Sequence, residues 1–126
     1  MHENYFDIPD LQMPTMSTFM EELSFLLPKL IGVRAEMISR EAGLEAFINN
    51  GRPSGVTLSE FNGVLVALDS SVRGLVPYMT NPNYSNGLTA ERQMFKVQAM
   101  MTRGANAMKE YMVMHDTCIY LSGRTD

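Results

Sequence analysis

The sequence predicts an all-α fold, an antiparallel bundle of three long helices preceded by an extended N-terminal arm. Apolar residues recur every three or four positions through three long segments, which is the periodicity of a helix packed on one side. Two stretches rich in Asn, Gly and Pro, residues 49–55 and 80–87, separate these segments. No stretch of useful length alternates apolar and polar residues as a strand does. Short connections of this kind favour antiparallel neighbours.

The chain of 126 residues is long enough for one domain. We therefore predict an arm over residues 1–14 and a single helical-bundle domain over residues 15–126. The arm lacks a helical period and combines three acids with large apolar side chains, among them Tyr5, Phe6 and Ile8. It is interpreted either as a frayed terminus or as a segment that docks on a neighbouring chain, and those three side chains are the predicted contacts.

The first helical segment contains a proline within its apolar pattern. Its apolar positions keep the three-four spacing from Met16 to Leu44. Pro28 has no amide hydrogen to bond the Ser24 carbonyl, so we predict a kink or a break there, with helices over 16–27 and 28–49. Thr18 and Glu21 fit a capping box at its start.

The second segment has a cleaner pattern. Thr57 and Glu60 fit another capping box, and the apolar positions that follow alternate threes and fours as far as Met79. This predicts one helix of about five to six turns. Pro77 is a point at which it could end or bend.

The third segment, residues 89–121, begins at the predicted cap Thr89 and carries two adjacent apolar stripes. Together they are wider than the arc of about 100° that a surface helix usually buries. We assign the stripe through Met101, Met108 and Met112 to the core of the chain. We assign the neighbouring stripe to contact with another chain, at Met100, Gly104, Tyr111 and Met114. Methionine suits such a seam because its flexible thioether fills irregular gaps.

Composition disfavours several classes of function. The net charge of −4 repels nucleic acid and anionic membranes, so neither is expected as the main ligand. No apolar run is long enough to cross a bilayer, and the first residues have neither the basic nor the apolar region of a secretion signal. With a single cysteine, Cys118, the chain is expected in the cytoplasm or in a particle assembled inside the cell.

The residues Met112, Met114, His115 and Cys118 are the strongest candidates for chemistry, since soft ligands of this kind suit copper(I). A hydrogen-bonded histidine and a buried free cysteine explain them more simply. A haem site is no better supported, and a Cys–His nucleophile pair has no third orienting group. We therefore predict no catalytic residue, no cofactor and no metal. Five glycines inside helices are interpreted as points of close helix approach.

These observations predict a non-enzymatic subunit of a homo-oligomer or of a larger particle, such as a virion, tail or secretion machine. Its partners are copies of itself or other assembly subunits, bound through the third helix and the N-terminal arm. The alternative is a small helical adaptor, chaperone or inhibitor that holds a partner's helix in a Met-lined groove. A solution mass measurement separates the two classes.

Overall fold

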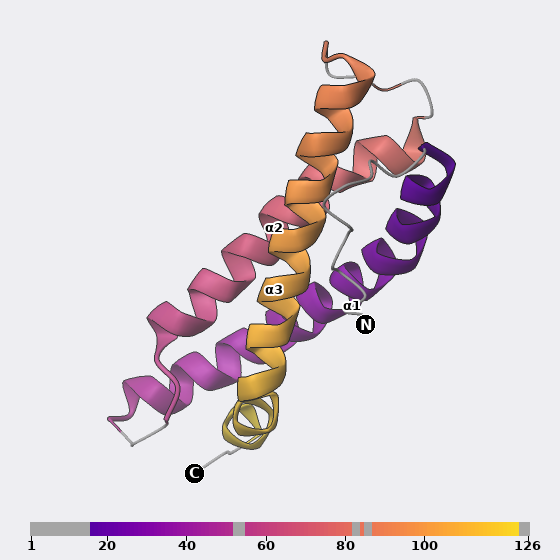
Figure 1. Ribbon diagram of the computed structural model, residues 1–126. Helices are drawn as coiled ribbons and strands as arrows, with labels where there is room; N and C mark the ends of the chain where they lie inside the picture. The colour runs from indigo at the N-terminus through magenta and orange to yellow at the C-terminus, as the bar shows by residue number, and fades with distance from the viewer. Residues whose placement is uncertain (1–15, 52–54, 82–83, 85–86, 124–126) are drawn as a thin grey trace, which may run out of the picture.

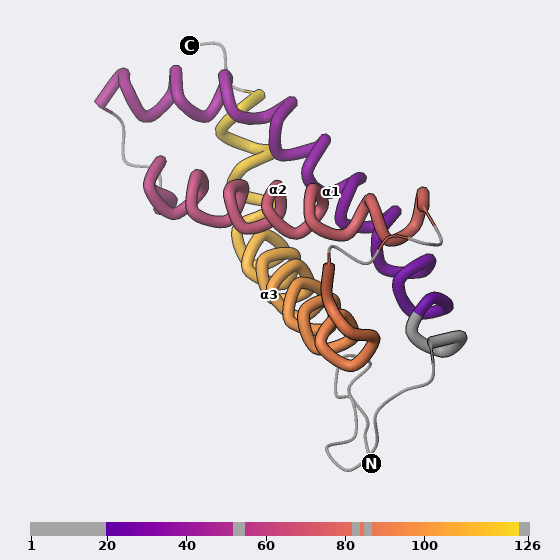
Figure 2. Tube along the Cα trace, turned by 90° about the horizontal axis from the view of Figure 1, so that it is seen from above, coloured from indigo at the N-terminus to yellow at the C-terminus, as the bar shows by residue number. Residues whose placement is uncertain are grey.

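The computed structural model describes residues 16–51, 55–81, 84 and 87–123, and within them it is all-helical. Three helices follow one another, α1 (Met16–Asn49), α2 (Leu58–Thr80) and α3 (Ala90–Ser122). Figure 1 shows α3 crossing both of the other helices, and Figure 2 shows the same arrangement from above. The prediction of an all-α bundle of three long helices is therefore confirmed. The N-terminal arm, with Tyr5, Phe6 and Ile8, lies outside the described residues.

Helix α1 is continuous through Pro28, so the expected break into two helices is wrong. Pro28 and Ser24 are both exposed, and water can therefore satisfy the Ser24 carbonyl that lacks an amide partner. The Ser24 hydroxyl donates to the Glu21 carbonyl at 2.7 Å. A kink at Pro28 stays a prediction. Thr18 lies inside the helix, which begins at Met16, so Thr18 is not its cap.

The other two helices begin at the predicted caps. The Glu60 amide donates to the Thr57 hydroxyl at 3.0 Å, and the Thr57 amide donates to the Glu60 carboxylate at 2.9 Å. These two bonds complete the capping box and satisfy two amides that the first turn of α2 leaves free. The Arg92 amide donates to the Thr89 hydroxyl at the start of α3. Helix α2 continues past Pro77 to Thr80.

Each helix packs against the other two, and one apolar core joins them. Three interior glycines let the helices approach closely. A Cβ on Gly104 would lie 2.8 Å from Leu30 of α1 and 3.1 Å from Ser71 of α2, so α3 nests between both helices at this point. Gly74 of α2 faces the sulfur of Met100, and Gly43 of α1 faces the backbone of Ser122.

The glycines at positions 32 and 63 do not lie at a close helix contact. A Cβ added at Gly32 or Gly63 would meet no described atom within 4 Å, and both residues are exposed. The expectation that interior glycines mark close helix approach is therefore confirmed at three of the five positions and is wrong at these two.

Candidate functional site

Apart from the exposed Met112, the methionines of both stripes of α3 lie on the side that packs against α1 and α2. Gly104 and Tyr111 are buried in the core, and Met100 and Met114 are half-buried against it. Met101, from the other stripe, is also buried. We call this side of α3 the inner face. The residues that the sequence assigned to another chain are thus covered by the protein's own helices.

The expected division between the two stripes is therefore corrected. Met112, assigned to the core, is 61% exposed, whereas Tyr111, assigned to a partner, is 1% exposed. The physical reason is the position of α3, which lies between two helices and not against one. Its buried arc is centred near Gly104 of the second stripe and includes Met101 of the first, so it is wider than a single helix neighbour would cover.

A polar cluster joins the inner face of α3 to α1. The Tyr111 hydroxyl donates to Glu36 Oε2 at 2.5 Å, and His115 Nε2 lies 3.0 Å from the same oxygen. His115 Nδ1 lies 3.0 Å from Asp116 Oδ1. The rings of Tyr111 and His115 meet edge to face with centroids 5.5 Å apart. His115 is thus hydrogen-bonded and half-buried, as the simpler interpretation of this residue expected.

Burial raises the pKa of the Tyr111 phenol above its usual range, and the hydrogen bond to Glu36 raises it further. Burial also raises the pKa of the Cys118 thiol, which makes this cysteine a poor nucleophile at neutral pH. Among the residues that the structure describes, no three His, Cys, Asp or Glu side chains are grouped so as to hold a metal ion. The contacts of the cluster fasten α3 to α1.

The opposite side of α3 is exposed over its whole length. We call it the outer face and define it by residues that recur three, four or seven positions apart: Phe95, Ala99, Thr102, Asn106, Val113 and Tyr120. Three of these are large and apolar, with exposed fractions of 67% for Phe95, 88% for Val113 and 63% for Tyr120. Phe95 and Val113 are about five turns apart and point in the same direction.

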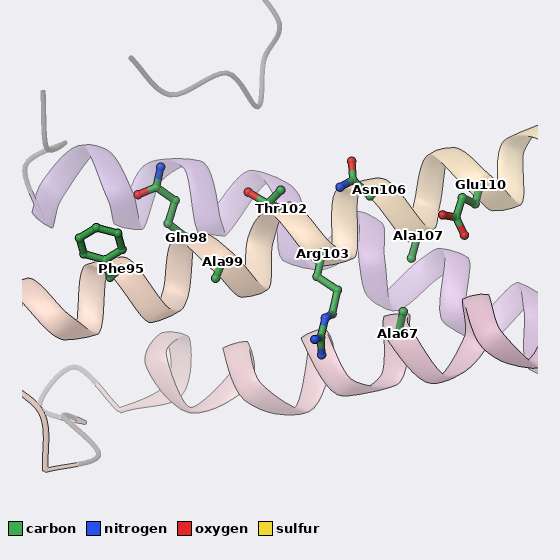
Figure 3. Close-up of a pocket in the computed structure, with 9 residues that line it drawn as sticks. All are labelled: Ala67, Phe95, Gln98, Ala99, Thr102, Arg103, Asn106, Ala107 and Glu110. Carbon is green, nitrogen blue, oxygen red and sulfur yellow. The ribbon is translucent and has the colours of Figure 1, made fainter. Parts of the chain in front are cut away.

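A shallow groove lies along the outer face beside α2, and we call it the Phe95 groove. Figure 3 shows its lining residues, which come from α3 except for Ala67 of α2. The hollow measures about 620 Å³, and small side chains such as Ala99 and Ala107 form part of its wall. A second hollow, lined by Leu88, Glu91, Arg92, Phe95 and Lys96, shares Phe95 with the first.

The charged side chains that line the Phe95 groove are Arg103 and Glu110, and those that line the second hollow are Glu91, Arg92 and Lys96. Arg92 and Lys96 are exposed beside Phe95, and Arg103 lies further along, 3.5 Å from the Ser70 hydroxyl. Glu91 is the single acid of residues 90–103. This stretch therefore carries net positive charge in a chain whose total is −4.

Helices α1 and α2 expose apolar residues as well, at Phe25, Ile31, Ile38 and Val66. Ile38 and Val66 border a smaller hollow in which Arg34 donates to Asp69 at 2.8 Å. Arg73 also contacts Asp69, so the charged groups of this surface are already paired within the chain.

No family model matches the chain, and the comparisons with curated proteins and with solved structures found no similar protein. Among the described residues, none of the helices combines the length and apolar character needed to cross a bilayer.

Sequence reasoning missed the outer face because its large apolar residues are sparse. Phe95, Val113 and Tyr120 are separated by polar or small residues, whereas the methionine stripes have an apolar residue at nearly every turn. The available signal was their common direction on a helical projection, opposite the stripes.

Proposed function

We propose that the protein is a non-enzymatic assembly subunit, an antiparallel three-helix bundle that binds copies of itself through the outer face of α3 and the N-terminal arm. The inner face holds the subunit together, and the outer face is available to a neighbour. A homo-oligomer is the simplest such assembly, and a larger particle is built from the same kind of contact.

The observation that supports this proposal is the line of exposed apolar residues on the outer face. Single exposed apolar residues are ordinary, but large ones that share one helix face are typical of protein interfaces. Phe95, Val113 and Tyr120 share such a face, and Phe95 also borders a groove. Aromatic residues of this kind contribute most to interface energy when a partner buries them.

The adaptor alternative requires a groove lined by methionine. From Met20 to Met114 the methionines are buried or half-buried except Met112, and the Phe95 groove is lined by other residue types. Assembly is therefore the function that the geometry favours.

Sedimentation velocity over a range of concentrations tests the proposal. We expect the wild-type protein to have a mass at least twice that of the 14.2 kDa monomer. Phe95→Ser should weaken self-association about ten- to hundredfold, since a partner no longer buries the ring, while the circular dichroism spectrum stays unchanged.

Phe25→Ser is the matched control, because Phe25 is 62% exposed and lies on α1. It should associate as the wild type does. A wild-type protein that remains monomeric at every concentration contradicts the proposal.

A further inference from the structure

We propose that the outer face of α3 binds the same face of a second copy, with the two helices antiparallel about a two-fold axis beside Asn106. The inference rests on the proposed function, self-association, and adds the segment that is bound and its direction. Three features support it: the charges of the Phe95 groove, the short side chains near its centre, and the spacing of the large apolar residues.

The two charged side chains that line the Phe95 groove are opposite in sign, and both are exposed (Figure 3). Arg103 and Glu110 lie about two turns apart, so both project from the same side of α3. In an antiparallel pair centred between them, Arg103 of each copy lies level with Glu110 of the other, and two ion pairs form. In a parallel pair, each side chain lies level with its own kind. The groove charges therefore complement those of a second copy in the antiparallel direction alone.

The centre of this arrangement carries short side chains. Ala99, Thr102 and Asn106 are exposed on the outer face, and short side chains let two helix axes approach closely. Asn106 lies next to the two-fold axis and therefore faces Asn106 of the second copy. Its side-chain amide both donates and accepts hydrogen bonds, so the two amides satisfy each other.

Large apolar residues lie toward both ends of the outer face, and antiparallel pairing brings them together. With this centre, Phe95 lies within one turn of the level of Tyr120 of the second copy, and the two-fold axis repeats this aromatic contact. Val113 lies level with the segment between Ala99 and Thr102, where short side chains leave room for it. The pairing therefore covers the three large apolar residues that the single chain leaves exposed on this face.

Among the described helices, α3 is the one that offers a matching partner face. Helix α1 exposes Phe25, Ile31 and Ile38, but Phe25 lies roughly 120° around the helix from the other two. Helix α2 exposes Val66 alone of its large apolar residues. The helix that combines large apolar residues toward both ends, short ones between them and an Arg and a Glu two turns apart is therefore a second α3.

Charge exchange between two full-length variants tests the pairing. In Arg103→Glu the two ion pairs become contacts between acids, and in Glu110→Arg they become contacts between bases. Each variant alone should therefore self-associate about tenfold more weakly than the wild type. In an equal mixture every acid lies level with a base, so association should return to the wild-type level. Sedimentation velocity measures the three samples, and circular dichroism checks that each variant is helical.

The matched controls are Lys29→Glu and Glu45→Arg, which make the same changes in net charge at exposed positions of α1. Both should associate as the wild type does. If they weaken association as much as the α3 variants do, net charge and not the pairing is responsible, which overturns this proposal.

Engineered disulfides test the direction of the pair. Asn106→Cys places two cysteines beside the two-fold axis, and mild oxidation should join them. Ala99→Cys places them roughly 20 Å apart along the helices, too far for a disulfide. Non-reducing gels measure the linked fraction, and the wild type is the control because its Cys118 is buried.

Three results would contradict the antiparallel pairing and leave self-association standing. These are single charge variants that associate as the wild type does, an equal mixture as weak as its components, and an Ala99→Cys protein that forms a disulfide as readily as Asn106→Cys. A wild-type protein that stays monomeric contradicts both proposals.

Discussion

The two faces of α3 differ in composition and in surroundings. The inner face is rich in methionine and small residues and is covered by α1 and α2, whereas the outer face sets Phe95, Val113 and Tyr120 among polar residues and is exposed. Methionine is common at adaptable binding surfaces, yet here it fills the irregular space where three helices cross. Met100, whose sulfur faces Gly74, is the clearest example. Residue type alone therefore does not distinguish a contact between helices of one chain from a contact with another chain.

Two tyrosines on α3 test this difference most strongly. Tyr111 is 1% exposed and bonded to Glu36, whereas Tyr120, nine residues later, is 63% exposed. Tyr111→Ala should lower the free energy of unfolding by about 3–5 kcal/mol because it leaves a cavity and removes one of the two side chains that contact the Glu36 carboxylate. Tyr120→Ala should change it by less than about 1 kcal/mol. Urea denaturation measures both, and similar losses in the two variants contradict the assignment of the faces.

Substitution by alanine should change the stability of the protein in opposite directions at two glycines. Gly104→Ala places a methyl group against Leu30 and Ser71 and should destabilise the protein by about 1–3 kcal/mol. Gly63→Ala meets no described atom within 4 Å and should stabilise it by up to about 1 kcal/mol through helix propensity. Thermal melts of the two variants show whether each substitution lowers or raises Tm relative to the wild type. Stabilisation by Gly104→Ala contradicts close packing of α3 between its neighbours.

The polar cluster of the inner face predicts sensitivity to alkaline pH. The pKa of Tyr111 is raised in the folded protein, so its contribution to stability is complete below pH about 10 and is lost as the pH rises further. Tyr111→Phe should lower stability by about 1–2 kcal/mol at pH 7 and should show a smaller fall of Tm above pH 10 than the wild type. Tyr120→Phe, on the outer face, should follow the wild-type curve. An identical alkaline fall in Tyr111→Phe contradicts this role.

The smallest effect is expected at Ser71, which is fully buried beside Gly104. Its hydroxyl has no hydrogen-bond partner among the described residues. Ser71→Ala should therefore be neutral or should stabilise the protein by up to about 1 kcal/mol. Chemical denaturation measures the change, and a loss above about 1 kcal/mol indicates that the hydroxyl is satisfied in solution.

Local chemistry made most of the fold predictable. Three-four periodicity and the caps Thr57 and Thr89 predicted α2 and α3 closely, because each signal depends on neighbours within one turn. The predicted helix break at Pro28 is wrong, because whether a proline interrupts a helix depends on the surroundings of the carbonyl that it leaves without an amide partner. The position is exposed, and a solvated carbonyl makes a proline tolerable within a helix.

The candidate site was less predictable, because periodicity gives the direction of a side chain and not the number of helices that cover it. Two helix neighbours cover parts of both methionine stripes, including Met101 and Tyr111, and leave Met112 exposed. The pairing of Tyr111 and His115 with Glu36 joins residues about 75 positions apart, and no local pattern encodes it.

Sedimentation velocity of two glutamate variants of α3, each with a circular dichroism melt, tests most directly whether the two faces have separate roles. Met101→Glu buries an unpaired carboxylate on the inner face and should unfold the chain. Val113→Glu, at an 88% exposed position of the outer face, should keep the wild-type Tm and lose self-association. If Val113→Glu still associates as the wild type does, or if both variants unfold, the outer face is not the surface that binds another copy.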